Sequence, residues 1–294
     1  MNLEADYVFR MIAFLKIRAS VCKCGIAGKL GFESIIEARD TLSAYMSMPP
    51  KVIAHRGASA HAPENTVPAF ELGWQQGADG VECDVRLTTD GQLVCIHDAD
   101  TNRVAGKSLI VESQSYADLQ QLDVGVWKGA DFKGTRIPLL SELLAISPLG
   151  KQVLIEVKAG IEILPALFEA LDAAPIELRV ITVIAFDFEV IRSLKQQRPE
   201  IGAYWLVDVK SNWLGRSKLK VDDVLDTLID IRADGLGLRC HSGINRDMVH
   251  AILSADVALN IWTVDDPTDA QRFDSFGVTS ISSNDPAAML AALK

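Results

Sequence analysis

The sequence predicts an α/β fold, namely a TIM (β/α)8 barrel with a small insertion after the second strand. Two observations predict the barrel: from residue 49 onward, short apolar runs alternate with helical patterns, and eight such runs fit into about 245 residues. A third observation places the insertion, because one interval between strands is much longer than the others. An open, doubly wound sheet is the alternative that alternation alone leaves open.

The predicted strands are short runs rich in Val, Ile and Leu, which is typical of strands buried on both faces. They lie at Val52–Ala54, Val81–Leu87, Val153–Val157, Val180–Phe186, Gly202–Val207, Gly235–Leu238, Ala258–Val264 and Val278–Ile281. Apolar residues at helical spacing predict helices between these strands. The predicted helices include Val67–Gln76, Pro165–Ala173, Phe188–Gln197, Val221–Arg232 and Arg246–Ser254.

The interval between Leu93 and Leu139 departs from this alternation. An additional strand, Leu93–His97, is followed by a polar stretch that contains several glycines, and we place the insertion at residues 99–138. Loops that follow barrel strands lie on the C-terminal face, where the active sites of such barrels form. The insertion is therefore expected to overhang the site.

The first 48 residues differ from the rest of the chain. Apolar residues between Val8 and Leu15 are spaced as on a helix, and a Pro-Pro pair ends the segment. Two hypotheses follow. Either translation starts at Met46 or Met48 and residues 1–45 are an artefact of gene-start assignment, or the segment is a helical appendage that contacts a partner or a membrane. The domain prediction is thus an extension at 1–48 and a barrel at 49–294.

Composition and charge exclude several classes of protein. The chain has 294 residues, of which 49% are apolar and 23% are charged, and these values exclude disordered and disulfide-scaffold proteins. A net charge of -10 disfavours nucleic-acid and anionic-membrane partners. Five scattered cysteines predict free thiols, and neither a bilayer-spanning run nor a secretory signal is evident. We therefore expect a cytoplasmic protein without stable membrane insertion.

Charged residues interrupt two of the predicted strands. Glu82 and Asp84 are two residues apart in one strand, and Glu156 and Lys158 are two apart in another, so each pair projects from one face. Charges that face a barrel interior are costly unless they are paired or bind a metal. These four residues indicate either a structural ion-pair network or a functional site.

A histidine is predicted to face these carboxylates. Asp90-Gly91 is a two-residue hairpin signal. With that loop, Asp84 lies directly opposite His97, and opposite residues project to the same face. A three-residue bulged loop would shift the register by one residue.

The first strand ends in the motif His55-Arg56-Gly57. A cation followed by a glycine suits a site where backbone and charge approach an anion closely. Asn65-Thr66 precedes a predicted helix, and helix capping explains both residues. Capping does not explain Glu64, which is a candidate to line the site.

The candidates together comprise two histidines, three carboxylates and two cations. Carboxylates without cysteine favour a hard cation, Mg²⁺ or Ca²⁺. Three carboxylates (−3), a divalent ion (+2) and the two cations (+2) sum to +1, which balances a singly charged phosphodiester. The histidines can then serve as general acid and general base. This combination points to cleavage of a P–O bond.

At these residues the sequence resembles the glycerophosphodiester phosphodiesterase family. The matching motifs are Ile53–Gly57, Pro63–Thr66, Gly80–Val85, His97-Asp98, Ile155–Lys158 and Ile261–Val264. The resemblance runs from about Lys51 to the C-terminus and implies a TIM barrel with a small insertion after the second strand. It also implies metal-dependent hydrolysis of glycerophosphodiesters, such as glycerophosphocholine and glycerophosphoethanolamine, to sn-glycerol 3-phosphate and an alcohol.

The resemblance implies a role for each matching residue. It makes His55 and His97 the acid–base pair, without deciding which is the base, and it makes Glu82, Asp84 and Glu156 the ligands of Mg²⁺ or Ca²⁺. The substrate-binding candidates are Arg56, Glu64, Lys158 and Trp262.

Two residues need a qualification, Trp262 for its role and Asn284 for its identity. Trp262 is implied to pack against the glycerol moiety, and a barrel-wall aromatic is its alternative. Asn284 stands where the family usually has an aspartate, so substrate preference or loop anchoring is expected to differ while activity is retained.

Two other functions stay open at this point. One is a lysophospholipase D or a phospholipase C-like enzyme on lipids that keep an acyl chain, which would need an apolar channel or a membrane-facing surface. The other is a non-catalytic barrel that binds an anion, although two titratable histidines argue against a mere binder. The sequence leaves open the oligomeric state and whether water or a substrate hydroxyl attacks the phosphorus.

Overall fold

A computed structural model describes residues 49–209 and 219–294 of the chain. Within these residues, eight parallel strands follow one another in the order β1-β9-β8-β7-β6-β5-β4-β2, and β1 pairs with β2 to close the barrel. The predicted TIM barrel is therefore confirmed, and the doubly wound sheet is wrong, because an open sheet does not join its end strands. Both hypotheses about residues 1–48 concern residues outside the described ones.

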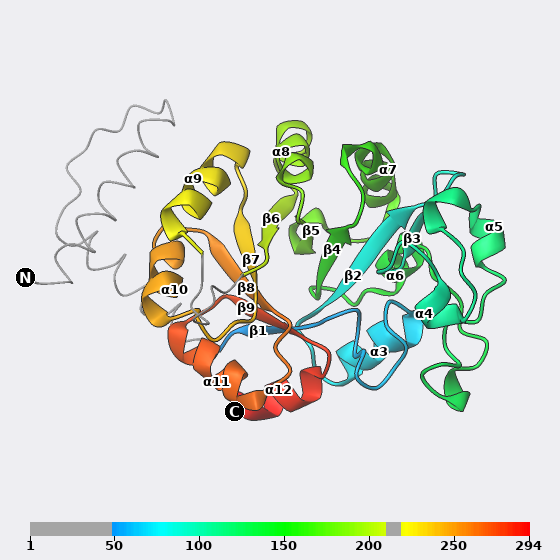
Figure 1. Ribbon diagram of the computed structural model, residues 1–294, viewed down its shortest axis with the longest axis horizontal. Helices are drawn as coiled ribbons and strands as arrows, with labels where there is room; N and C mark the ends of the chain where they lie inside the picture. The colour runs from blue at the N-terminus through cyan, green and yellow to red at the C-terminus, as the bar shows by residue number, and fades with distance from the viewer. Residues whose placement is uncertain (1–48, 210–218) are drawn as a thin grey trace, which may run out of the picture.

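Helices surround the barrel strands in Figure 1. The strands are β1 (Lys51–Ala54), β2 (Gly80–Leu87), β3 (Leu93–Cys95), β4 (Gln152–Val157), β5 (Ile181–Ala185), β6 (Gly202–Val207), β7 (Gly235–Arg239), β8 (Ala258–Trp262) and β9 (Ser280–Ser283). The α-helices are α3 (Val67–Gln75), α4 (Asn102–Ala105), α5 (Tyr116–Leu119), α6 (Leu140–Ile146), α7 (Leu164–Ala173), α8 (Phe188–Gln197), α9 (Val221–Ile231), α10 (Arg246–Leu253), α11 (Pro267–Phe276) and α12 (Pro286–Ala292). Short 3₁₀ helices are η1 (Val111–Ser113), η2 (Ala130–Phe132), η3 (Ile161–Ile163) and η4 (Leu178–Val180).

Strand β9 lies two residues later than predicted. The prediction followed the apolar run at 278–281, whereas the strand spans Ser280–Ser283. Ser280 and Ser282 hydrogen-bond with the buried side chain of Asn260, at 2.8 and 3.2 Å. A strand whose inward residues are satisfied polar side chains is not visible as an apolar run, so the pattern missed its second half.

The hairpin of β2 and β3 has a register one residue away from the predicted one. Its loop has three residues, Thr89-Asp90-Gly91, and Gly91 adopts a left-handed φ of 77°. This geometry is that of a turn followed by a bulge. Ile96 therefore lies opposite Asp84 and donates its N–H to the Asp84 carbonyl at 3.0 Å. The prediction that His97 lies directly opposite Asp84 is wrong, and His97 instead follows the end of β3.

Large apolar side chains fill the barrel interior. A buried cluster joins strands on different sides of the barrel and consists of Ile53, Leu154, Ile184 and Leu206. Glycines on β7 leave room for such side chains: a Cβ atom on Gly235 would lie 2.4 Å from the ring of Tyr204. This apolar layer fills the barrel below the ends of β2 and β4, so charged residues nearer the C-terminal ends of those strands lie above it.

The insertion at residues 99–138 has a small apolar core, to which β3 and Ile96 also contribute. Its short helices α4 and α5 lie at one side of the molecule, next to β3 (Figure 1). The buried side chains of this core are Val94, Ile96, Val104, Val111, Leu119, Leu122, Val124 and Ile137. Lys128 donates from Nζ to the Ser59 carbonyl at 2.6 Å. Since Ser59 lies in the loop after β1, the insertion reaches the C-terminal face of the barrel.

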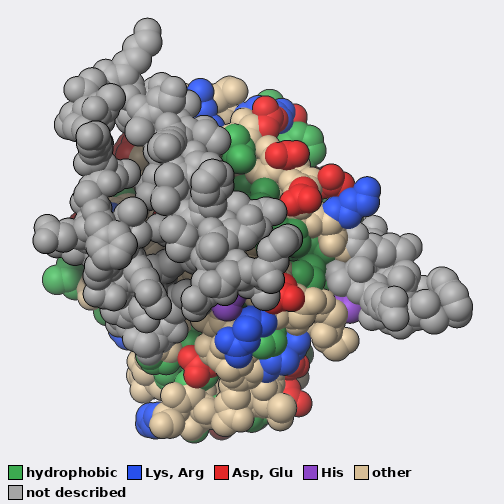
Figure 2. Space-filling model, turned by 90° about the vertical axis from the view of Figure 1, so that its left-hand side faces the viewer, with side chains coloured by type: hydrophobic (Ala, Val, Ile, Leu, Met, Phe, Trp, Pro, Cys, Tyr) green, Lys and Arg blue, Asp and Glu red, His purple; other side chains and the backbone are tan. Residues whose placement is uncertain are grey.

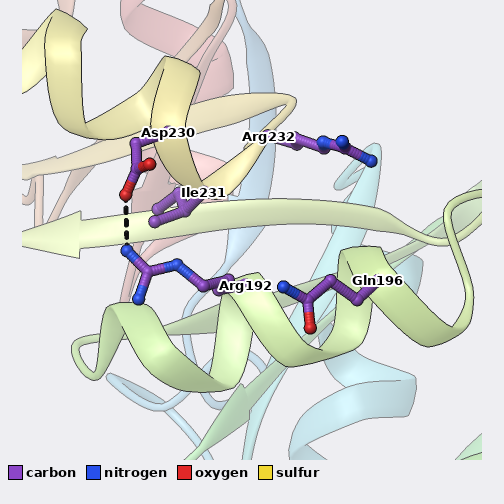
Figure 3. Close-up of a pocket in the computed structure, with 5 residues that line it drawn as sticks. All are labelled: Arg192, Gln196, Asp230, Ile231 and Arg232. Atoms are coloured by element: carbon purple, nitrogen blue, oxygen red, sulfur yellow. Dashed lines mark hydrogen bonds and ion pairs between the residues drawn. The ribbon is translucent and has the colours of Figure 1, made fainter.

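The outer surface carries charged side chains and a hollow between two helices. Acidic and basic side chains are interspersed on the described part of the face in Figure 2. A hollow of about 250 Å³ lies between α8 and α9, and Figure 3 shows its Arg192 held by Asp230 at 2.5 Å. Within 49–209 and 219–294, none of the helices has the length and apolar character that a bilayer crossing requires.

We expect Gly235→Ala to destabilise the fold by overpacking the barrel interior against Tyr204, at a cost of about 1–3 kcal/mol. The free energy of unfolding from chemical denaturation measures this. Gly129→Ala is the matched control, because a Cβ there would meet only Phe132 at an ordinary 3.7 Å. Equal stability of the two variants would contradict a filled interior.

Candidate active site

Three buried carboxylates meet at the C-terminal end of the barrel. Glu82 and Asp84 project from β2, and Glu156 projects from β4, where the parallel register sets it beside Asp84. Their residues are only 1%, 0% and 7% exposed, respectively. Because strand residues two apart share a face, the predicted placement of these side chains on one side of their strands holds in the structure.

The three carboxylates form a possible metal site. One oxygen from each lies within 4.8 Å of the others. The buried Oε1 of Glu82 has no hydrogen-bond partner. An unpartnered buried carboxylate oxygen is costly unless a cation binds it. The donor set, oxygen only and negatively charged, therefore fits a hard divalent cation.

The pKa values of these acids reflect their crowding. Burial, together with the charge of Asp84, raises the pKa of Glu82 well above its ordinary value. The same two causes raise the pKa of Glu156 to about 7. Burial also opposes ionisation of Asp84, but Lys158 and Arg56 hold its pKa below the ordinary value. Asp84 is thus the most readily ionised of the three acids, whereas the two glutamates hold their protons more tightly than free carboxylic acids do.

Two cations offset part of this negative charge. Lys158 Nζ lies 3.0 Å from Asp84 Oδ1 and also contacts Glu156. The Arg56 guanidinium places Nε 3.1 Å from Asp84 Oδ2. Both cations remain partly open to solvent, with side chains 14% and 18% exposed. They can therefore meet an anion that enters from the mouth of the barrel.

The loop after β1 is folded tightly over Glu82. Arg56 has a left-handed φ of 56°, and its backbone N–H donates to Glu82 Oε2 at 2.8 Å. Gly57 follows with a φ of 77°, and a Cβ atom there would lie 2.4 Å from the Ala69 carbonyl carbon. Only glycine fits this close approach to the backbone of α3.

His55 lies between the acids and the loop that follows β9. Its Nε2 is 4.0 Å from Glu82 Oε2, and its Nδ1 is 2.8 Å from Asn284 Oδ1. Burial and the charge of Arg56 lower the pKa of His55. A neutral imidazole therefore faces the acidic cluster at neutral pH.

His97 lies on the side of the site that the insertion forms. Its Nδ1 is 2.7 Å from Asp98 Oδ1, and Arg103 from α4 contacts the other oxygen of Asp98 at 2.6 Å. Burial lowers the pKa of His97, while Asp84 and Asp98 oppose that shift. The structure thus brings His97 within electrostatic reach of Asp84, although not through the predicted strand register.

Glu64 accepts hydrogen bonds from two arginines. Its Oε1 accepts from Arg56 at 2.9 Å, and its Oε2 accepts from Arg103 at 2.6 Å. Both oxygens of this substrate-binding candidate are therefore occupied by the protein itself. Sequence reasoning did not identify Arg103, because no pattern in the sequence links α4 to the loop after β1.

Asn65 is a site residue that the sequence prediction misassigned to helix capping. Helix α3 has Thr66 at its N-cap, without a side-chain capping bond. Asn65 instead donates from Nδ2 to Asp84 Oδ2 at 2.7 Å and accepts from the Asp84 N–H at 3.0 Å. This two-point contact fixes the carboxylate that both cations share.

Trp262 lies at the end of β8, against the interior cluster. Its ring packs edge-on against Phe186 at a centroid distance of 5.5 Å, and the Arg239 guanidinium lies 6.0 Å from the ring centroid. The indole thus contacts both the barrel interior and exposed Phe186 after β5, and its packing against the glycerol moiety stays a prediction.

Comparisons with known proteins show what the chain is similar to. The family model described as "Glycerophosphoryl diester phosphodiesterase family" matches residues 55–288. A glycerophosphodiester phosphodiesterase of Caldanaerobacter subterraneus is 32% identical over 249 residues, which are 81% of this chain and 96% of the relative. One of Bacillus subtilis is 26% identical over 251 residues, which are 80% of this chain and 83% of that relative.

A solved structure is similar to most of the chain. It is an Oleispira antarctica phosphodiesterase in complex with the product sn-glycerol-3-phosphate, and it is 29% identical to this chain. The TM-score is 0.74, and the match covers 84% of this chain and 98% of that one. The match to the family model, residues 55–288, lies outside the first 48 residues.

We expect binding of Mg²⁺ to strengthen as the pH rises from 6 to 8, and to release protons. The raised pKa values of Glu82 and Glu156 mean that bound protons compete with the cation at the lower pH. Isothermal titration calorimetry in two buffers of different ionisation enthalpy measures both effects.

Variants give this titration its controls. Glu82→Gln should weaken binding by about tenfold or more, whereas Glu71→Gln, on the exposed side of α3, should bind as the parent does. A pH-independent affinity without proton release would contradict the raised pKa values.

Proposed function

The chain belongs to the glycerophosphoryl diester phosphodiesterase family, and we propose that it hydrolyses glycerophosphodiesters to sn-glycerol 3-phosphate and an alcohol. Glycerophosphocholine and glycerophosphoethanolamine are the proposed substrates. The observation that carries the proposal is the triad of buried carboxylates, within 4.8 Å of one another, beside His55, Arg56 and Lys158. The glycerol-3-phosphate bound to the Oleispira antarctica relative supports the product assignment.

Glu82, Asp84 and Glu156 are the proposed ligands of a divalent cation, Mg²⁺ or Ca²⁺. When bound, such an ion neutralises phosphoryl charge and polarises the P–O bond. The protein itself keeps Asp84 ionised through Lys158 and Arg56, and it keeps the carboxylate of Asp84 oriented through Asn65. Asp84 therefore provides an ionised and oriented carboxylate to which a cation can bind.

Arg56 and Lys158 are the proposed partners of the phosphoryl oxygens. Each contacts Asp84 from a different side and keeps part of its side chain open to solvent. Glu64 accepts a hydrogen bond from the Arg56 guanidinium, so we propose that it orients this cation instead of contacting the substrate itself. A fixed guanidinium loses less conformational entropy when it binds an anion.

His55 and His97 are the proposed acid–base pair. One removes the proton of the attacking group, which is water or a substrate hydroxyl, and the other donates a proton to the leaving alcohol. Each ring has its Nδ1 engaged by the protein, with Asn284 for His55 and Asp98 for His97, which leaves Nε2 for the reacting groups. The lowered pKa values favour the neutral ring, whose Nε2 can accept a proton, and this suits the base. The other ring has to carry hydrogen on both nitrogens before its Nε2 can donate a proton to the leaving alcohol.

Exposed apolar side chains near the site support a second candidate function on acylated lipids. Trp127 in the insertion is 42% exposed, and Phe186 after β5 is 45% exposed. Trp127 adjoins Lys128, which contacts the loop after β1, and Phe186 contacts Trp262. An acyl chain would find apolar contacts there, so lysophospholipids are the second substrate class to test.

We propose a cytoplasmic location for the enzyme. Cys83, Cys95 and Cys240 are free thiols in the described residues, as is usual for proteins of reducing compartments.

We expect glycerol 3-phosphate to be released from glycerophosphocholine and glycerophosphoethanolamine with Mg²⁺ or Ca²⁺, and EDTA to abolish the release. His55→Ala and His97→Ala should each lower kcat by about 10²–10⁴-fold, the usual effect of removing a general acid or base. A coupled assay for glycerol 3-phosphate measures all of these rates.

His250→Ala is the matched control, because His250 lies on α10, outside the site, and the variant should keep parental kcat. No turnover of any glycerophosphodiester with either ion would refute the proposed substrates. Turnover of lysophospholipids instead would favour the second candidate, and silence with both classes would favour an anion-binding barrel.

A further inference from the structure

Asn284 is held between a histidine and a carboxylate. Its Oδ1 is 2.8 Å from His55 Nδ1, and its Nδ2 donates to Asp265 Oδ2 at 2.6 Å. A carboxylate only accepts hydrogen bonds, so the amide nitrogen has to face Asp265. The amide oxygen then has to face His55, and this orientation follows from the chemistry of the partners.

The orientation of the amide determines the tautomer of His55. Because Asn284 Oδ1 only accepts, Nδ1 of His55 has to carry the hydrogen. In the neutral ring, Nε2 is then the nitrogen with the free lone pair, and it is the one that faces Glu82 at 4.0 Å. The pair of residues thus aims the proton-accepting atom of His55 at the acidic cluster.

Asp265 is itself fixed by the chain around Asn284. Its Oδ1 accepts from the backbone N–H of Asn284 at 2.8 Å and from Ser283 Oγ at 3.0 Å. Ser59 Oγ adds a contact of 2.7 Å to Asn284 Oδ1. Asp265 is exposed, but both of its oxygens accept hydrogen bonds from residues 283 and 284. It can therefore hold the Asn284 amide in one orientation.

We propose that Asp265 and Asn284 are a complementary pair of positioning residues for His55, and that the pair works with its residue types exchanged. The proposal rests on the proposed function, in which His55 transfers a proton. The sequence singled out Asn284 only as a departure from the aspartate usual in the family, and it assigned no role to Asp265. In the structure, Asp265 supplies the carboxylate that position 284 lacks.

The geometry explains why an exchange preserves function and a single change does not. The pair needs an acceptor at position 284 for His55 and a donor–acceptor contact between positions 284 and 265. Asn284→Asp alone sets two carboxylates against each other at the present 2.6 Å contact. Asp265→Asn alone leaves two amides, so that either end of Asn284 can face His55. The double variant restores one carboxylate and one amide, with the acceptor again toward Nδ1.

The test is a double-mutant cycle on hydrolysis of glycerophosphocholine. Asp265→Asn and Asn284→Asp should each lower kcat by about tenfold, with KM little changed, and the double variant should return to within about threefold of the parent. Asp222→Asn, on the exposed start of α9, controls for loss of one surface charge and should leave kcat unchanged. A double variant no faster than the slower single variant would overturn the proposal.

A second readout does not depend on activity. Nitrogen-15 chemical shifts of the histidine rings, with His55 assigned through its loss in His55→Ala, report which nitrogen carries the hydrogen. Parent and double variant should show hydrogen on Nδ1, and Asp265→Asn should show a mixture of the two tautomers. Hydrogen on Nε2 in the parent would overturn the proposal even in a fully active enzyme.

The two readouts separate this proposal from the proposed function. If the parent turns over no glycerophosphodiester, the proposed function fails, while the nitrogen shifts still support or overturn the pair. Thermal unfolding of each variant shows whether a loss of kcat reflects a loss of fold, because a positioning role predicts the kcat change at an unchanged melting temperature.

Discussion

The repulsion among three carboxylates at the C-terminal end of the barrel is the constraint on which the site depends. Glu82, Asp84 and Glu156 are all buried, so water cannot screen them, and each remaining contact in the site offsets part of the cost. Lys158 and Arg56 pair with Asp84, Asn65 clamps it, and the Arg56 backbone N–H caps Glu82. The unpartnered oxygen of Glu82 shows that these contacts do not suffice, and a bound cation would complete them.

The same charges organise the loops that carry the histidines. Arg56 joins Asp84 to Glu64, and Arg103 joins Glu64 to Asp98, which holds His97. This alternating chain of acids and arginines runs from the barrel floor to the insertion. Its outer members are partly exposed, so each link contributes little to stability, but together they fix where His97 stands. The insertion is thus coupled to the acidic cluster through charge pairing and not only through its own apolar core.

The sequence predicted those parts of the site that follow from strand periodicity. Residues two apart on a strand share a face, so Glu82 with Asp84 and Glu156 with Lys158 could be placed without a structure. The contacts that orient them could not, because Asn65 and Arg103 come from loops whose conformation depends on tertiary packing. The predicted register of the hairpin was wrong for a local reason. Gly91, with a left-handed φ, makes the turn one residue longer than predicted and so shifts His97 by one position. The predicted position of β9 was wrong because its inward residues are serines, which hydrogen-bond with Asn260 and do not form an apolar run in the sequence.

The two histidines are held in the same way by groups of different charge. Behind His55 stand an amide and then a carboxylate, Asn284 and Asp265, whereas behind His97 stand a carboxylate and then a guanidinium, Asp98 and Arg103. In both cases an acceptor meets Nδ1, and a second group fixes that acceptor. The direction of the hydrogen bond is therefore common to both rings, while the charge of the acceptor differs. An imidazole needs its Nδ1 hydrogen accepted to present Nε2, and an amide does this as well as a carboxylate if its flip is prevented. This is why an asparagine at position 284 is compatible with a working site, provided that a fixed carboxylate lies behind it.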